Sequence, residues 1–324
     1  MPKLRVLDLS VSRASSLDAS SCGWHTPPPF LVTLPLLATL ILSLPPSVEP
    51  LRLRGWAVAM EPCAGVTSAE ASSRVSTLAH DTAEQLRATL RARAAVIAAS
   101  MRGASALLPL LSLRLPALRE LVWVDTSFGR GTLPSVITSS PSAAAVTRAC
   151  LHAGLVSMRS LAKLSLCVAV DDPSAALLSS ATPSIRRLCI AVGPGFTNAG
   201  CASLASMGGL RVLRLEASAS ESDRPSVTAA GVAALLSPRE GAPCVLRALC
   251  VDVACAGAEE AAAAHAARCE HTLDAVRISG GGVGGDASRF VRRAGATGLA
   301  ACGAPEFEAA WAAAWEEEDG DALC

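Results

Sequence analysis

Two groups of residues in the last third of the chain have types and spacing that could support chemistry. The first is the run SGGGVGG, Ser279 to Gly285, which follows a strand-like segment. Backbone N–H groups of such a loop can bind phosphate where a helix begins. The run lacks the Lys-Ser/Thr pair of a P-loop and an acidic residue placed to contact a ribose. We interpret it as a flexible exit from the strand. An α/β nucleotide-binding enzyme that uses Gly280–Gly285 is the alternative of another class.

The second group is His265, Cys269 and His271. His265 and Cys269 are four residues apart, and two ligands on one helical face can hold zinc. A closed site needs four donors, and no second pair with ligand spacing lies nearby in the sequence. The G-x-S-x-G and H-E-x-x-H motifs are absent, and the five histidines form no evident nucleophile–base set. The sequence therefore predicts a protein without enzymatic activity, catalytic residues, metal or cofactor.

The composition of the 324-residue chain excludes several kinds of partner. The formal net charge is zero, so there is no long-range attraction for nucleic acid or an anionic membrane. Aromatic residues are 3 % of the chain and Tyr is absent, which leaves few platforms for base stacking. The twelve cysteines contain no CxxC pair. We predict free thiols in a reducing compartment, either cytoplasmic or nuclear.

A repeated hexamer indicates which elements position these residues. The template is L-x-x-L-x-L, with any aliphatic residue accepted at the L positions. Clear matches are LRELVW at Leu118, LAKLSL at Leu161, IRRLCI at Ile185, LRVLRL at Leu210, LRALCV at Leu246 and LDAVRI at Leu273, and weaker ones are LRVLDL at Leu4 and LATLIL at Leu37. From Leu161 onward the intervals between starts are 24, 25, 36 and 27 residues. Helix-like segments such as Thr197–Met207 and Val227–Pro238 lie between the hexamers.

This pattern resembles the leucine-rich repeat family, in the helix-containing variety similar to ribonuclease inhibitor. The resemblance implies an α/β fold, a leucine-rich-repeat solenoid with a curved parallel sheet and convex helices. The Asn or Cys that this family has after the hexamer is missing or unclear in most repeats. A doubly wound α/β sheet is the alternative fold, but the short interval and the constant frame of the hexamers count against it.

The resemblance implies that residues between the leucines face the concave side, since side chains alternate along a strand. The third hexamer positions form one column: Glu120, Lys163, Arg187, Val212, Ala248 and Ala275. The fifth positions form another: Val122, Ser165, Cys189, Arg214, Cys250 and Arg277. The residues just after the hexamers include Glu216 and Asp252. We expect a protein partner to bind this face through Lys163, Arg187, Arg214, Glu216, Asp252 and Arg277.

The most apolar stretch of the chain, Leu34 to Trp56, has three interpretations. Its apolar run from Phe30 to Leu44 has 15 residues and contains Pro35, so it is short for a membrane span of about 20 residues. We therefore expect no membrane insertion. An LP pair, an apolar helix ending in ILSLPP, then LRLR and a Trp resemble the F-box, which docks on the Skp-type adaptor of cullin ubiquitin ligases. The acidic residues usual after LP are absent.

The F-box resemblance implies a substrate-recognition subunit of a ubiquitin ligase. The adaptor-facing residues would then be Leu36, Leu37, Leu40, Ile41, Leu44 and Trp56. The alternative is that the stretch is the first part of the solenoid and that the chain is a protein-binding scaffold without a ligase.

The predicted organisation has five parts. They are a poorly ordered segment with one possible repeat strand (1–33), an F-box-like or first solenoid part (34–62), a helical linker or cap (63–115), the solenoid (116–300), and a helical end with an acidic tail (301–324). The amphipathic segment Ala69–Ser100 is the predicted cap, and we expect Trp315–Cys324 to be a disordered tail. The chain is interpreted as a non-catalytic protein-binding scaffold.

Overall fold

The computed structural model describes twelve stretches of the chain. They are residues 4–9, 30–53, 56–59, 107–123, 148, 151–193, 195–217, 226–236, 245–255, 273–280, 288–292 and 299–316. The chain divides into two compact units. Unit 1 comprises Met1–Leu161 with Ser165–Cys167, and unit 2 comprises Ala162–Leu164 with Val168–Cys324. Both combine helices with mostly parallel strands, which confirms the α/β class.

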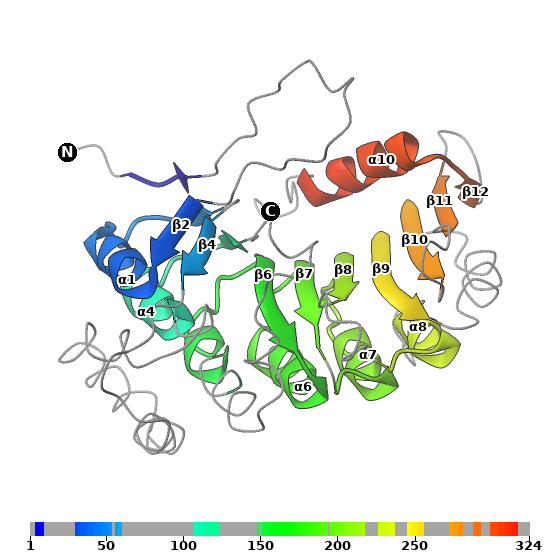
Figure 1. Cartoon of the computed structure of the whole chain (residues 1–324), viewed down its shortest axis with the longest axis horizontal. Helices are drawn as coiled ribbons and strands as arrows, with labels where there is room; N and C mark the ends of the chain where they lie inside the picture. Colours follow the sequence, from blue (N-terminus) through cyan, green and yellow to red (C-terminus); the bar gives the residue numbers. More distant parts are fainter. Residues whose placement is uncertain are drawn as a thin grey trace. The chain divides into compact units, whose positions relative to one another are not determined.

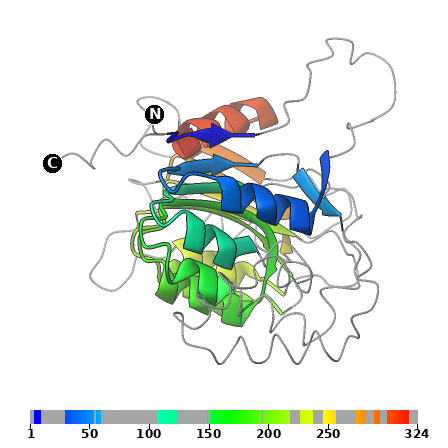
Figure 2. The ribbon, with the colours of Figure 1, turned by 90° about the vertical axis from the view of Figure 1, so that its left-hand side faces the viewer.

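Unit 1 is built from short elements. They are β1 (Leu7–Asp8), β2 (Phe30–Thr33), α1 (Leu34–Ser43), β3 (Pro50–Arg52), β4 (Trp56–Ala59), α4 (Leu107–Arg114) and β5 (Glu120–Trp123). Strand β3 pairs in parallel with β1 on one side and β5 on the other, while β2 and β4 form a separate parallel pair. Helices α1 and α4 contact each other, as Figures 1 and 2 show.

One of the two weaker hexamer matches is not a repeat strand. LATLIL at Leu37 lies within helix α1, which confirms the helical interpretation of this stretch. Leu37, Ile41 and Leu44 have helical spacing and are all buried, so the apolar stripe favours the helix. The repeat strand comes slightly later, at Val48–Leu53, where Val48, Leu51 and Leu53 fit the same template and are buried. The LRLR sequence of the F-box resemblance thus begins in strand β3.

Unit 2 contains the longer strands. They are β6 (Lys163–Val170, of which Ser165–Cys167 belong to unit 1), β7 (Arg187–Val192), β8 (Val212–Ala217), β9 (Ala248–Cys255), β10 (Ala275–Gly280), β11 (Ser288–Arg292) and β12 (Leu299–Ala301). The strands neighbour one another in chain order. Strands β7 to β10 pair in parallel, whereas β11 and β12 are antiparallel additions.

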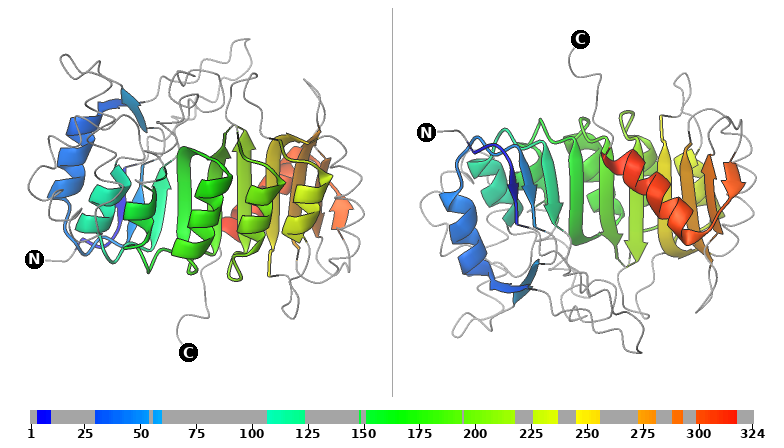
Figure 3. Two further views of the ribbon diagram at one scale, coloured as in Figure 1. Left: turned by 90° about the horizontal axis from the view of Figure 1, so that it is seen from below. Right: turned by 90° about the horizontal axis from the view of Figure 1, so that it is seen from above.

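The helices of unit 2 are α6 (Asp172–Ala181), α7 (Asn198–Ala205), α8 (Ala229–Leu236) and α10 (Ala304–Glu316). Helices α6, α7 and α8 lie on one face of the sheet, and α10 lies on the other (Figures 1 and 3).

The hexamers of unit 2 are confirmed as strands with a common frame. The three aliphatic side chains of IRRLCI, LRVLRL, LRALCV and LDAVRI are all buried. One backbone ladder repeats: the carbonyl at the second hexamer position accepts from two consecutive N–H groups of the next hexamer. The accepting residues are Ala162, Arg186, Arg211 and Arg247. Each repeat is therefore held to the next by the same hydrogen bonds.

The helix N-termini of unit 2 form a second ladder. Thr197 caps α7, and its hydroxyl and N–H both donate to the Asp172 carboxylate of the preceding helix. One repeat later, the N–H of Thr228 donates to Oδ1 of Asn198, whose amide donates to the Thr228 hydroxyl. Each helix start thus supplies an acceptor for the next, which satisfies donors that helices leave unpaired at this end.

Two glycines make this second ladder possible. A Cβ on Gly200 would lie 2.6 Å from Oδ1 of Asp172, and one on Gly231 would lie 2.5 Å from Oδ1 of Asn198. Each glycine is three residues after its cap, at the place where the preceding helix reaches across. The close approach of the neighbouring side chain therefore requires glycine at both positions.

Candidate protein-interaction face

The inner face is the face of the unit 2 sheet that lies opposite α6, α7 and α8. The strand register confirms the two predicted columns from β7 to β10. Arg187, Val212, Ala248 and Ala275 are register partners in sequence, and so are Cys189, Arg214, Cys250 and Arg277. Glu216 pairs in register with Asp252 on the next strand. Side chains from four strands therefore form continuous rows.

The sequence predicted that the inner face is presented to a partner. In the structure α10 crosses this face obliquely and covers part of it (Figure 3). Lys163 is 5 % exposed and Arg187 is 8 % exposed, although both were expected to be presented to a partner. Trp315 and Glu316 were expected to begin a disordered tail. They form the end of α10 instead, and Trp315 is buried. The structure does not describe residues 317–324.

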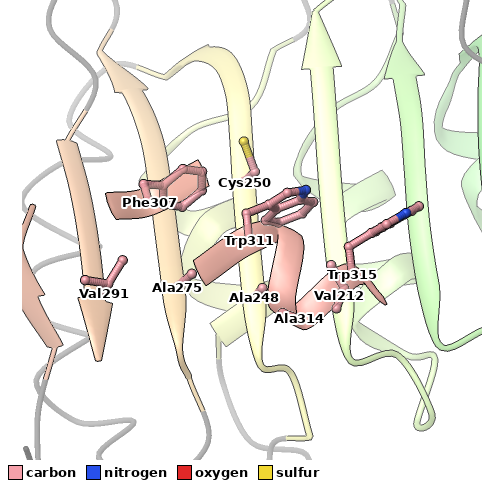
Figure 4. Packing of buried hydrophobic residues seen from close by; sticks show 9 residues of the cluster. All are labelled: Val212, Ala248, Cys250, Ala275, Val291, Phe307, Trp311, Ala314 and Trp315. Carbon is pink, nitrogen blue, oxygen red and sulfur yellow. The ribbon is translucent and has the colours of Figure 1, made fainter. Parts of the chain in front are cut away.

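Helix α10 presents three aromatic side chains to the sheet at a spacing of four residues. Phe307, Trp311 and Trp315 are all buried, and neighbouring ring centroids are 6.1 and 6.2 Å apart (Figure 4). A helix rises about 6 Å over four residues, and neighbouring strands are about 4.8 Å apart. An oblique helix with this spacing can place successive aromatic rings over successive strands.

The sheet beneath these rings is lined with small side chains. Val212, Ala248, Cys250 and Ala275 are buried against α10 in one apolar cluster, shown in Figure 4. The third-position column therefore changes along the sheet, from the long cations Lys163 and Arg187 to small apolar residues. The small residues leave room for a helix to approach the strands and for its indole rings to pack tightly.

Polar contacts connect α10 to cations on β10 and β8. Near its start, Glu308 lies 3.6 Å from the Arg277 guanidinium on β10. At its middle, the Trp311 ring lies 5.9 Å from the guanidinium carbon of Arg214 on β8, within cation–π range.

The last turn of α10 meets the basic end of the face. The Arg187 Nε donates to the Ala314 carbonyl at 3.4 Å. The Lys163 Nζ lies 3.4 Å from a Glu316 carboxylate oxygen and 5.0 Å from the centre of the Trp315 ring. The last carbonyls of a helix carry partial negative charge and lack intrahelical partners, so two cations stabilise this end. Helix α10 itself contains Glu306, Glu308 and Glu316 and no Lys or Arg.

The two acidic residues predicted on the inner face are Glu216 and Asp252. Glu216 faces its own strand neighbour, with a carboxylate oxygen 2.7 Å from Nε of Arg214. Asp252 is described by its backbone register alone. In unit 1, residues at the third and fifth hexamer positions form their own ion pairs: Arg52 donates to both oxygens of Glu120 at 2.6 and 3.0 Å and lies 3.8 Å from Asp8.

Helix α10 was not predicted as part of this site, although two signals for it are present in the sequence. The first is the spacing of Phe307, Trp311 and Trp315 in a chain with ten aromatic residues in all. The second is the set of small apolar residues at strand positions that the repeat pattern assigns to the open face. Apolar residues at such positions indicate that another element covers them.

The predicted adaptor-facing set lies in unit 1. Leu37, Ile41 and Leu44 are core residues and Leu40 is half-buried. Leu36 and Trp56 are placed by their backbones in α1 and β4. The Arg114 Nε donates to the Leu44 carbonyl, which ties the end of α1 to α4. In this arrangement α1 uses its apolar stripe for its own core.

The other chemical candidates are largely outside the described part of the chain. His265, Cys269, His271, the Ala69–Ser100 segment and most of the glycine loop after Gly280 belong to residues that the structure does not describe. Among the residues that it does describe, no three His, Cys, Asp or Glu side chains are grouped as metal ligands. Within the same residues, no helix has the length and apolar character needed to cross a membrane.

Comparison with known proteins adds no family to this picture. Neither the protein-family models nor the curated proteins contain a match to this chain.

Proposed function

We propose that this chain is a non-catalytic protein-binding scaffold of the leucine-rich-repeat type, whose inner face recognises a helical segment. Two features support the solenoid. Consecutive hexamers repeat the same backbone ladder, and consecutive helix starts repeat the same cap contacts on one side of the sheet. Stacked units of this kind bury a continuous core and present a long uniform face.

The observation that carries the proposal is the seating of α10. This helix contacts cations on β6, β7, β8 and β10 and packs aromatic rings on the small residues between them. A face that accepts one amphipathic helix in this way has the shape and charge to accept another. Helix-in-groove binding is a recurrent mode of peptide recognition.

The test compares binding partners of the whole chain with those of charge variants. Arg277→Glu changes the inner face at a side chain that is 19 % exposed. Arg159→Glu makes the same change in charge at an exposed position of unit 1. Proteins that bind the chain after α10 has been cut from the sheet by a protease should be lost with Arg277→Glu and kept with Arg159→Glu. If both variants retain the same partners, the inner face is not the recognition surface.

The ubiquitin-ligase receptor is the second candidate, and α1 ending at a Pro-Pro turn favours it. In this role the chain binds its substrate through the inner face, as the scaffold binds its partner, and also binds a Skp-type adaptor through α1. Because Leu37, Ile41 and Leu44 are core residues of unit 1, adaptor binding requires α1 to expose them or to use its half-buried Leu40. Co-purification of a Skp-type adaptor with the whole chain, and its loss with Leu40→Glu, would support this role. A folded chain that leaves the adaptor behind would exclude it.

A further inference from the structure

We infer that α10 is an intramolecular occupant of the inner face, and that the external partner is an acidic amphipathic helix that replaces it. This inference rests on the proposed function, because it names the ligand and the regulation of the same face. The partner helix would have aromatic residues four apart and carboxylates beside the first and last of them. In α10 these residues are Phe307, Trp311, Trp315, Glu308 and Glu316.

Charge complementarity fixes the direction of the partner helix. Lys163 and Arg187 lie under the last turn of α10, where helix carbonyls and Glu316 concentrate negative charge. Arg277 lies near its start and meets Glu308. A partner helix therefore binds with its carboxyl end toward β6. A helix of the opposite direction would direct its positive end at two buried cations.

The connection of α10 to β12 is accessible. Gly303, just before the helix, is exposed, and glycine gives this link wide conformational freedom. The acidic ends of the ion pairs are accessible, since Glu308 and Glu316 are each 52 % exposed. A tethered helix competes at an effective concentration of about millimolar for a short linker. A partner helix therefore has to bind the inner face more tightly, or be present at a higher concentration, than the tethered α10. The tether thus sets the lowest affinity at which a partner can bind.

The experiment places a protease site in the whole chain between Gly303 and Ala304, so that α10 can be cut from the sheet without removing residues. The probe is a fluorescent peptide with the sequence Ala304–Glu316. The control peptide has the same composition and charge but carries Trp311→Ala with Ala312→Trp, which breaks the aromatic spacing. Binding is followed by fluorescence anisotropy before cutting, and after cutting and gel filtration.

We expect the probe to bind the cut chain at least about 10-fold more tightly than the uncut chain, because the tethered competitor has gone. The control peptide should bind the cut chain at least about 10-fold more weakly than the probe. Arg277→Glu in the cut chain should weaken the probe, and a peptide with Glu308→Arg should recover the loss. This recovery would locate the peptide on the inner face in the direction of α10.

Three results would overturn the inference. Equal binding to cut and uncut chains would place the peptide elsewhere. A cut helix that stays bound through gel filtration and does not exchange with the probe would make α10 a permanent part of the core. Mixed dimers formed by exchange of α10 between two uncut chains would make a second copy the occupant. If the probe binds as expected while the cut chain captures no protein whose binding depends on Arg277, the proposed function fails, but α10 remains a displaceable occupant of the inner face.

Discussion

The indole of Trp311 lies at the centre of the contact between α10 and the sheet. It stacks between Phe307 and Trp315 and lies near Arg214, and it is 8 % exposed. Trp311→Ala would leave a cavity over the small residues of β8 and β9, which cannot fill it. We expect the free energy of unfolding to fall by about 3–5 kcal/mol.

Urea denaturation followed by circular dichroism measures this effect. Ala312→Ser is the matched control, because Ala312 is an exposed residue on the same helix, and it should change stability by less than about 0.5 kcal/mol. Equal effects of the two variants would contradict the packing described for α10.

The Arg277–Glu308 pair should contribute much less than the aromatic residues. Glu308 is half exposed, so solvent screens the pair, and such pairs typically contribute about 0.2–1 kcal/mol. A double-mutant cycle with Arg277→Glu and Glu308→Arg should give a coupling energy in this range. The coupling should shrink toward zero at 1 M salt, where charges are screened within about 3 Å. A coupling near zero already at low salt would show that the pair does not form in solution.

At the scale of elements, the hydrogen bonds between successive helix N-termini predict that a glycine-to-alanine change in a helix is destabilising, the opposite of what helix propensity alone predicts. Gly231→Ala within α8 would normally favour the helix by about 1 kcal/mol. Here the new Cβ would lie 2.5 Å from Oδ1 of Asn198, so we expect the variant to lower the free energy of unfolding by about 1–3 kcal/mol. Thermal or urea denaturation measures the change.

Two further variants define the cause. Gly209→Ala meets its nearest atom at 3.4 Å and should be tolerated. In a chain that carries Asn198→Ala, the nearest obstructing atom is gone and Sγ of Cys201, at 3.2 Å, remains. Gly231→Ala should therefore lower the free energy of unfolding clearly less in that chain than in the natural one. Equal losses in the two chains would indicate that contacts other than the Asn198 side chain set the cost.

Repeat strands were predictable because their signal is local. Each hexamer carries three aliphatic residues at fixed spacing, and the structure buries them as that spacing requires. Helix α7 and its Thr197 cap follow from the same kind of short pattern. LATLIL was ambiguous because its aliphatic residues satisfy a helix and a strand template together; in the structure it is helical, and Leu37, Ile41 and Leu44 are buried.

The cover on the inner face was not predictable from local spacing. Lys163 and Glu316 are 153 residues apart, so no window of sequence contains both. The aromatic spacing in α10 indicates an amphipathic helix but does not identify the surface that it packs on. The repeat pattern assigns Lys163 and Arg187 to an exposed face, and a long-range contact overrides that assignment.

At the scale of the whole chain, the N-terminal elements are structural parts of unit 1. Strand β3 pairs with β5, and α1 packs on α4. A chain that starts after Met60 loses β1, β3 and α1, which uncovers the edge of β5 and apolar side chains of α4. We expect this chain to aggregate, since exposed strand edges promote association. Sedimentation and soluble yield relative to the whole chain measure this.

Leu40→Glu is the matched comparison, because Leu40 is half-buried and its replacement keeps every strand. This variant should remain in solution at a yield near that of the whole chain. If the shortened chain is equally well behaved, unit 1 does not depend on its first strands for cohesion.

The order of the elements along the chain also has a consequence for synthesis. Strands β6 to β10 leave the ribosome before α10, because α10 follows Gly280 by more than twenty residues. At about 5–20 residues per second, the nascent sheet waits some seconds for its cover. During that interval a partner helix meets no tethered competitor. A partner present at the site of translation could thus be loaded more readily than one that encounters the finished protein.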